Sequence, residues 1–260
     1  MIRAGGVFDL RQGESILAAG VSADWSTSTN PRIKVAEQDQ ILSPHKGADH
    51  GYDIFIADYR GYGKSEGTPS PRGLYLDTQA AFDYALKLKA KKNYPQFIVA
   101  GQSLGGSLVL KLLSEEKNKK EKVDLVILDS TFRSNSQVGA AMLRKHWLTF
   151  LLSPLSYLLL QDNYNASIDD LRQWNYPTLC VTHLRDPVVP AYLTQQIYEY
   201  LNPQHPKWLW LRNDNDVGHI NSFLLDGGSY NLRLLAFLKD LEPRSTRGPV
   251  SLDRAHSKEL

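Results

Sequence analysis

The segment from residue 97 to residue 113 constrains the fold more than any other part of the sequence. It opens with the apolar run 97–100, which includes β-branched residues and is typical of a buried strand. The strand ends at Gly101-Gln102-Ser103-Leu104-Gly105, and residues 107–113 then carry apolar side chains at helical spacing. Strand and helix patterns also alternate from residue 52 onward, with helices predicted at 74–92, 191–201 and 230–241. This alternation predicts an α/β fold with a mostly parallel sheet flanked by helices.

The turn in this segment has the pattern Gly-x-Ser-x-Gly between a strand and a helix, which is the context of a nucleophile elbow. We expect Ser103 to occupy a strained turn, with Gly101 and Gly105 leaving room for the strand and the helix to pass closely. The start of the helix offers unpaired N–H groups to an oxyanion. The alternative interpretation is a glycine-rich connection that merely exposes a serine.

Composition narrows the class of protein. The chain has 260 residues, 42% hydrophobic and 22% charged, with a net charge of +2, so it can form one sizeable domain and gives no reason to expect a nucleic-acid partner. The lone Cys180 lies in an apolar run, which predicts a buried thiol. The chain has no cysteine pair and no His-x-x-x-His motif, so we expect neither a metal nor another cofactor.

A serine nucleophile needs a base, and the base needs an acid that fixes its tautomer. Asp186 follows the predicted strand 177–182, and His219 follows the predicted strand 207–211, which gives the order Ser103, Asp186, His219. Asp129 is the rival acid and Asp58 a weaker one, because each also ends a predicted strand.

Two further histidine hypotheses follow from the strand ends. His183 is the other histidine at such a position, and we interpret it as a loop-packing residue. A metal hydrolase built from His183, Asp186 and His219 stays open as an alternative chemistry.

Five ordered motifs together resemble the α/β-hydrolase superfamily, and its prolyl-oligopeptidase-like and serine-aminopeptidase-like branch most closely. They are Gly-Tyr-Asp-Ile-Phe-Ile-Ala-Asp-Tyr-Arg-Gly-Tyr-Gly-Lys-Ser at 51–65, Gly-Gln-Ser-Leu-Gly-Gly at 101–106, Asp-Ser-Thr-Phe at 129–132, Asp-Pro-Val-Val-Pro at 186–190 and Gly-His at 218–219. The resemblance implies that Ser103 is the nucleophile, Asp186 the acid and His219 the base. It also implies that the Leu104 N–H is one oxyanion donor.

The resemblance predicts three parts of the chain. Residues 51–241 form the hydrolase domain, with a helical cap inserted at about 134–174, and residues 242–260 form a disordered tail. Residues 1–50 look shortened or replaced, because no apolar strand ending in His-Gly precedes residue 52, although 7–10 and 15–21 have strand character. That missing loop would supply the second oxyanion N–H.

We therefore expect a serine hydrolase that cleaves a small ester, thioester or amide through an acyl-serine. A catalytically impaired member of the same fold that binds lipid or a membrane surface is the alternative. The apolar stretch 147–160 is interrupted by Pro154 and is too short to span a bilayer, so it would cover the site or touch a membrane peripherally. Residues 1–10 contain no secretory signal, which predicts a cytoplasmic location.

Overall fold

A parallel sheet of six strands forms the core of the described part of the chain. The computed structural model describes residues 15–20, 52–62, 65–115, 123–145, 150–154, 165–213, 219 and 236–237. Within them the strands lie in the order β2-β1-β3-β4-β5-β6. Their bounds are β1 Ser15–Gly20, β2 Tyr52–Ala57, β3 Gln96–Gln102, β4 Leu125–Asp129, β5 Thr178–His183 and β6 Lys207–Arg212.

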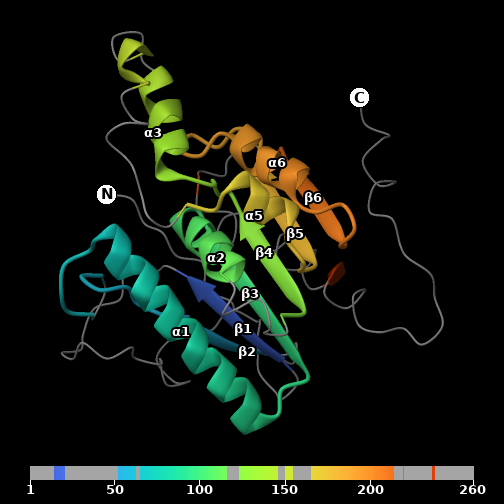
Figure 1. Cartoon of the computed structure of the whole chain (residues 1–260). Coiled ribbons are helices and arrows are strands. Elements are labelled where there is room, and N and C mark those ends of the chain that lie inside the picture. The colour runs from blue at the N-terminus through green and yellow to red at the C-terminus, as the bar shows by residue number, and fades with distance from the viewer. Residues whose placement is uncertain are drawn as a thin grey trace.

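Four of the described helices lie over one face of this sheet (Figure 1). They are α1 Pro71–Lys92, α2 Leu104–Ser114, α5 Ile168–Arg172 and α6 Ala191–Tyr200. The Ser70 side chain caps α1 by accepting from the Gly73 N–H, and Asn93 ends that helix in a left-handed conformation. The predicted helices 74–92 and 191–201 are therefore confirmed within a few residues.

Successive side chains of β3 point to opposite faces of the sheet, and both sets are buried. Phe97 and Val99 pack into the apolar cluster beneath the helices, whereas Ile98 and Ala100 are buried outside that cluster. The edge strand β6 follows the same rule, because Leu209 packs against the cluster and its neighbour Trp208 instead meets Phe237 at a ring-centroid distance of 5.0 Å. The chain therefore places apolar side chains against the sheet from both sides.

The N-terminal strand of the sheet differs from the sequence prediction in one respect. β1 pairs in parallel with both β2 and β3, and Gly20 lies level with Ala57 and Gly101. The predicted strand 15–21 is thus confirmed, and the predicted start of the domain at residue 51 is wrong, because a central strand comes from the first twenty residues. The apolar run Ile-Leu-Ala-Ala of β1 is short and built half of small residues, so it gives a weak signal. The strand character of 7–10 lies outside the described residues.

The predicted cap divides into two parts. Helix α3 Asn135–Arg144 and the short 3-10 helix η2 Phe150–Leu152 project beyond the carboxyl end of the sheet (Figure 1). Residues 165–174 do not, because Ala166, Leu171 and Trp174 are buried in the main apolar cluster. Ser167 and Asp170 form a capping box that starts α5 and directs Leu171 inward. The cap therefore ends before residue 165.

Several predictions fall on undescribed residues. The closing helix 230–241 does so except for positions 236–237, and the tail 242–260 does so entirely. Within the described part of the chain, no helix combines the length and apolar character needed to cross a membrane.

Candidate active site

Ser103 sits in a strained turn between β3 and α2. Its backbone angles are φ 51° and ψ −122°, a combination that L-residues rarely adopt. The Ser103 N–H donates to the Asp129 carbonyl over 2.9 Å, so the next strand holds the turn in place. The side chain makes no capping hydrogen bond to α2, which leaves its hydroxyl available to other partners.

Gly101 permits the sharp reversal behind this serine. A Cβ atom added to Gly101 would lie 2.6 Å from the Gly106 Cα and 2.7 Å from the Gly105 carbonyl oxygen. Because both obstacles are backbone atoms, strand and helix can approach this closely only when residue 101 is glycine. The sequence prediction named Gly101 and Gly105 for this purpose.

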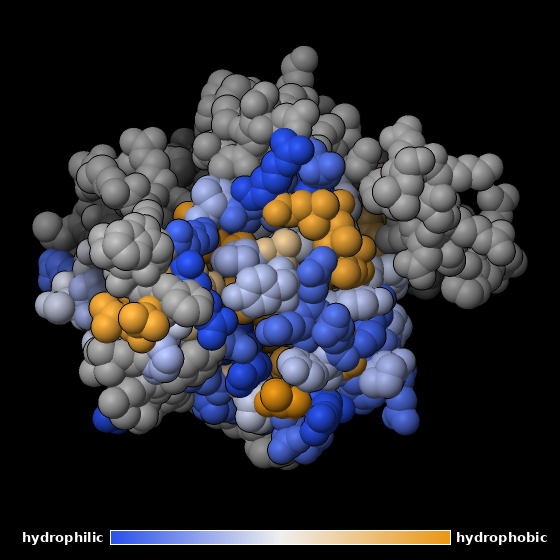
Figure 2. Space-filling model, turned by 90° about the horizontal axis from the view of Figure 1, so that it is seen from above, coloured by the Kyte–Doolittle hydropathy of each residue, from blue (hydrophilic) through white to orange (hydrophobic). Residues whose placement is uncertain are grey.

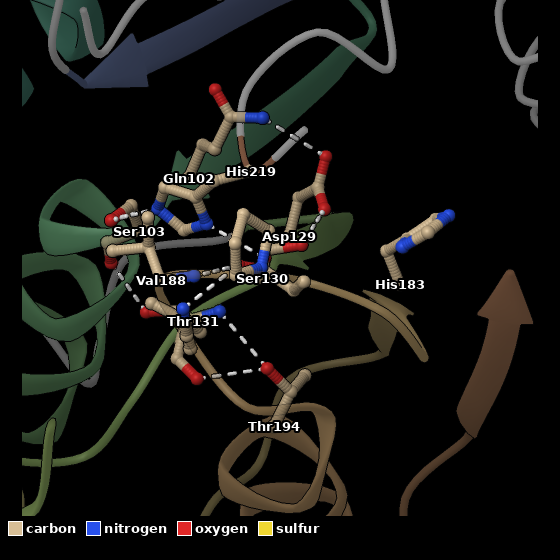
Figure 3. Close-up of polar contacts among 12 residues, drawn as sticks. Gln102, Ser103, Asp129, Ser130, Thr131, His183, Val188, Thr194 and His219 are labelled. Atoms are coloured by element: carbon tan, nitrogen blue, oxygen red, sulfur yellow. Dashed lines mark hydrogen bonds and ion pairs between the residues drawn. The ribbon is translucent and has the colours of Figure 1, made fainter. Parts of the chain in front are cut away.

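A second close approach, between Gly106 and Thr131, was not predicted from the sequence. A side chain at position 106 would overlap that of Thr131. The Thr131 hydroxyl donates to the Ser103 carbonyl over 2.5 Å, and Thr131 is held in turn because its N–H donates to the Thr194 hydroxyl over 2.9 Å (Figure 3). The motif Asp-Ser-Thr-Phe was visible in the sequence, but no spacing rule indicated that its threonine touches the serine turn.

The structure brings together Ser103, His219 and Asp186, which lie far apart in the sequence. His219 Nε2 is 2.8 Å from the Ser103 Oγ, and His219 Nδ1 is 2.6 Å from the Asp186 Oδ2 (Figure 3). The side chains of His219 and Asp186 are 4% and 0% exposed, so the pair is shielded from water. With Nδ1–H donating to the carboxylate, Nε2 carries the lone pair that accepts the serine hydroxyl proton.

The loop after β5 fixes the position of the acid. Asp186 Oδ1 accepts from the N–H groups of Val188 and Val189, each over 2.8 Å. These two bonds direct Oδ2 toward His219. Asp186 therefore behaves as a rigidly held acceptor for the imidazole.

The rival acids have other partners. Asp129 is buried, and its carboxylate accepts from the Gln102 amide over 3.3 Å and from the Ser130 hydroxyl over 3.0 Å. Asp58 follows β2, which is separated from β3 by β1. Of the three candidate acids, Asp186 is the one that lies 2.6 Å from His219 Nδ1.

His183 is buried at the end of β5, where its Nδ1 accepts from the Arg185 N–H over 3.2 Å. Its ring points away from Ser103 (Figure 3). Among the described residues no group of three or more His, Cys, Asp or Glu side chains is placed to hold a metal ion.

The loop after β2 packs beside the first turn of α2. Arg60 donates to both carboxylate oxygens of Asp77 on α1, the shortest bond being 2.7 Å, and this hydrogen bond raises the pKa of Arg60. Tyr62 and Leu104 pack against the same small apolar cluster. The bidentate Arg60–Asp77 pair thus holds the loop after β2 in place beside Leu104.

The Leu104 N–H belongs to the first residue of α2, where no intrahelical acceptor exists for it. It lies next to Ser103 at the positive end of the helix dipole. The residues that follow β1, where a second oxyanion donor would be expected, lie outside the described part of the chain.

Comparison with known proteins shows which family the chain resembles. The model described as "alpha/beta hydrolase fold" matches residues 38–152. The protein is 31% identical to the uncharacterized protein YfhR of Escherichia coli K12 over 204 residues, which is 76% of this chain and 64% of YfhR. It is also 26% identical to rat lysophosphatidylserine lipase ABHD12, over 74% of this chain and 50% of that protein. These matches make the chain similar in sequence to members of the alpha/beta-hydrolase superfamily.

Solved structures agree on the fold. An esterase from Pyrococcus furiosus, Pf2001, superposes with a TM-score of 0.57 at 20% identity and covers 89% of this chain and 83% of its own. The chain spans about half to two thirds of the length of the curated relatives described above. The predicted α/β-hydrolase fold is confirmed.

Proposed function

We propose that the protein is a serine hydrolase that cleaves a small ester, thioester or amide through an acyl-serine intermediate. The observation that carries the proposal is the bridging position of His219, which has one ring nitrogen 2.8 Å from Ser103 Oγ and the other 2.6 Å from Asp186 Oδ2. A hydroxyl, an imidazole and a carboxylate in this order are the components of nucleophilic acyl transfer.

In the first half-reaction, His219 Nε2 takes the hydroxyl proton as Ser103 Oγ attacks the substrate carbonyl carbon. Asp186 stabilises the imidazolium that forms, and the Leu104 N–H donates to the oxyanion. The tetrahedral intermediate then collapses, and His219 gives its proton to the departing alcohol, thiol or amine. Acyl-Ser103 remains.

In the second half-reaction, His219 removes a proton from water, and the hydroxide oxygen attacks the acyl carbon. Collapse of this second intermediate breaks the bond to Ser103 Oγ, which regains its proton from His219. The products are a carboxylic acid and the free enzyme. The relative named lysophosphatidylserine lipase supports an ester as the substrate class.

A fluorophosphonate probe tests the proposal because it reacts with an activated serine and needs no known substrate. We expect a single adduct on Ser103, with labelling lost in Ser103→Ala. Ser130→Ala is the matched control, since Ser130 also ends a strand with a positive φ of 47° but its hydroxyl donates to Asp129.

Absence of label on folded wild-type protein, or equal labelling of Ser103→Ala, would contradict the proposal. The first outcome would favour the catalytically impaired member as the alternative. The metal hydrolase predicts instead that chelators abolish hydrolysis and that Ser103→Ala leaves it unchanged.

A further inference from the structure

Helix α3 and η2 end in a tip that exposes apolar side chains. The tip comprises residues 142–145 and 151–152. Leu151 is 82% exposed, Leu152 50% and Met142 39%, and two adjacent leucines this exposed stand out from the rest of the described surface. Arg144 Nε donates to the Ser153 hydroxyl over 3.4 Å, which ties η2 to the end of α3.

The charged residues of the segment 130–161 have one sign. Arg144 and Lys145 are both exposed at the end of α3. The sequence has no Asp or Glu from position 130 to position 161, whereas at the chain's average a stretch this long would hold about three. Cations at a helix C-terminus interact favourably with the helix dipole. This interaction accounts for Arg144 and Lys145 but not for the exposed leucines.

Exposed leucines beside cations, with no acidic residue between them, match the chemistry of an anionic lipid surface. Apolar side chains enter the boundary between headgroups and acyl chains, and Arg or Lys contacts the phosphates. A second copy of the chain fits less well, because a two-fold contact through the tip would bring Arg144 and Lys145 near their own counterparts.

The tip is joined to the candidate active site. The Lys145 ammonium donates to the carbonyl of Pro187, the residue next to Asp186. Val138 and Ala141 of α3 pack in one cluster with Val189 and with Leu104, which follows Ser103. α3 rises beside α6 at the carboxyl end of the sheet (Figure 1), and the view onto that end shows separate apolar groups among hydrophilic ones (Figure 2).

We propose that the α3–η2 tip docks onto a bilayer that contains anionic phospholipid. Docking would place the cap and the Asp186 loop at the lipid surface, so the acyl substrate of the proposed function would be one that partitions into that surface. Binding to the bilayer is itself independent of hydrolysis, and the two ideas can fail separately.

The test uses the full chain carrying Ser103→Ala, so that no lipid is consumed, and measures co-sedimentation with vesicles. We expect binding to phosphatidylcholine vesicles that contain phosphatidylserine and little binding to phosphatidylcholine alone, with affinity falling as salt rises. Arg144→Gln should weaken binding about fivefold, which corresponds to about 1 kcal/mol for one cation near the surface. Leu151→Ser combined with Leu152→Ser should weaken it further.

Two controls match these variants. Leu76→Ser alters a leucine on α1 that is 47% exposed, and Lys91→Gln removes an exposed cation from the last turn of α1. Both should bind like the parent, and the thermal melting of every variant reports whether it is folded. Equal binding to both vesicle types, no binding to either, or equal weakening by the control variants would overturn the proposal.

Two further outcomes are decisive. If the two leucine substitutions change only the oligomeric state seen by gel filtration, the tip is an interface between copies and the proposal fails. A wild-type protein that takes up fluorophosphonate but ignores both vesicle types would leave the hydrolase proposal intact and remove this one.

Discussion

At the scale of single residues, two buried aspartates compete for the same chemical role. Asp186 contacts His219 Nδ1 at 2.6 Å, whereas the Asp129 carboxylate accepts from Gln102 and Ser130. Both follow strands of the same sheet, so their partners and not their burial distinguish them.

We predict that Asp186→Asn lowers kcat for a p-nitrophenyl ester about 10⁴-fold, because an amide at this position no longer holds the imidazole in its productive tautomer. Asp129→Asn should cost less than about tenfold, the equivalent of one neutral hydrogen bond. Stopped-flow or steady-state hydrolysis measures both, with melting temperatures as the check on folding. A larger loss in Asp129→Asn than in Asp186→Asn would reverse the assignment.

At the scale of the elements, the serine turn depends on how closely β3 and α2 approach. An added Cβ at Gly101 meets backbone atoms of Gly105 and Gly106, and these cannot move without displacing the helix. At Gly73 on α1, by contrast, the nearest atoms at 2.6 and 2.8 Å belong to the side chains of Arg60 and Ser70. These side chains can shift without displacing the backbone, although they would strain their bonds to Asp77 and to the Gly73 N–H.

Gly101→Ala should therefore destabilise the protein by several kcal/mol, on the order of the larger values seen for overpacked sites, and should abolish fluorophosphonate labelling. Gly73→Ala should cost markedly less. Urea unfolding monitored by tryptophan fluorescence gives both free energies, and a Gly101→Ala protein as stable as Gly73→Ala would show that the turn can relax.

The elements also show what the sequence could predict. The hydrophobic patterns of β3, β4 and β5 and the glycine-bounded serine placed these strands and Ser103 correctly, because fully buried parallel strands leave continuous apolar runs. The order of Asp186 and His219 along the chain suggested their roles, but only folding shows them within bonding distance. The place of β1 inside the sheet and the inward packing of α5 were not predicted, since small residues and a five-residue helix carry little periodicity.

The hydrogen bonds of Thr131 were not predicted for a different reason. Its contacts with Ser103 and Thr194 join residues that lie 28 and 63 positions apart. Hydrogen bonds of this kind follow from tertiary packing, and no local sequence pattern predicts them.

At the scale of the whole molecule, Cys180 offers a probe of how the sheet opens. It is 0% exposed in β5, which lies between β4 and β6, and it is the only cysteine in the chain. Burial raises the pKa of its thiol to about 12, and the charge of nearby Lys207 offsets part of that rise. A thiol reagent therefore needs the strands to separate before it can react.

We predict that Cys180 reacts with Ellman's reagent in native buffer only at the rate of global opening, and quickly in urea. The raised pKa also sets the sign of the pH dependence: above the ordinary thiol pKa of 9.0 the unfolded chain releases a proton that the folded chain retains. This difference lowers the free energy of unfolding by about 1.4 kcal/mol per pH unit until the pH approaches the folded value. Cys180→Ala lacks this contribution, so its stability should fall less steeply above pH 9 in urea titrations, and parallel curves for the two proteins would contradict the burial of the thiol in a cooperative sheet.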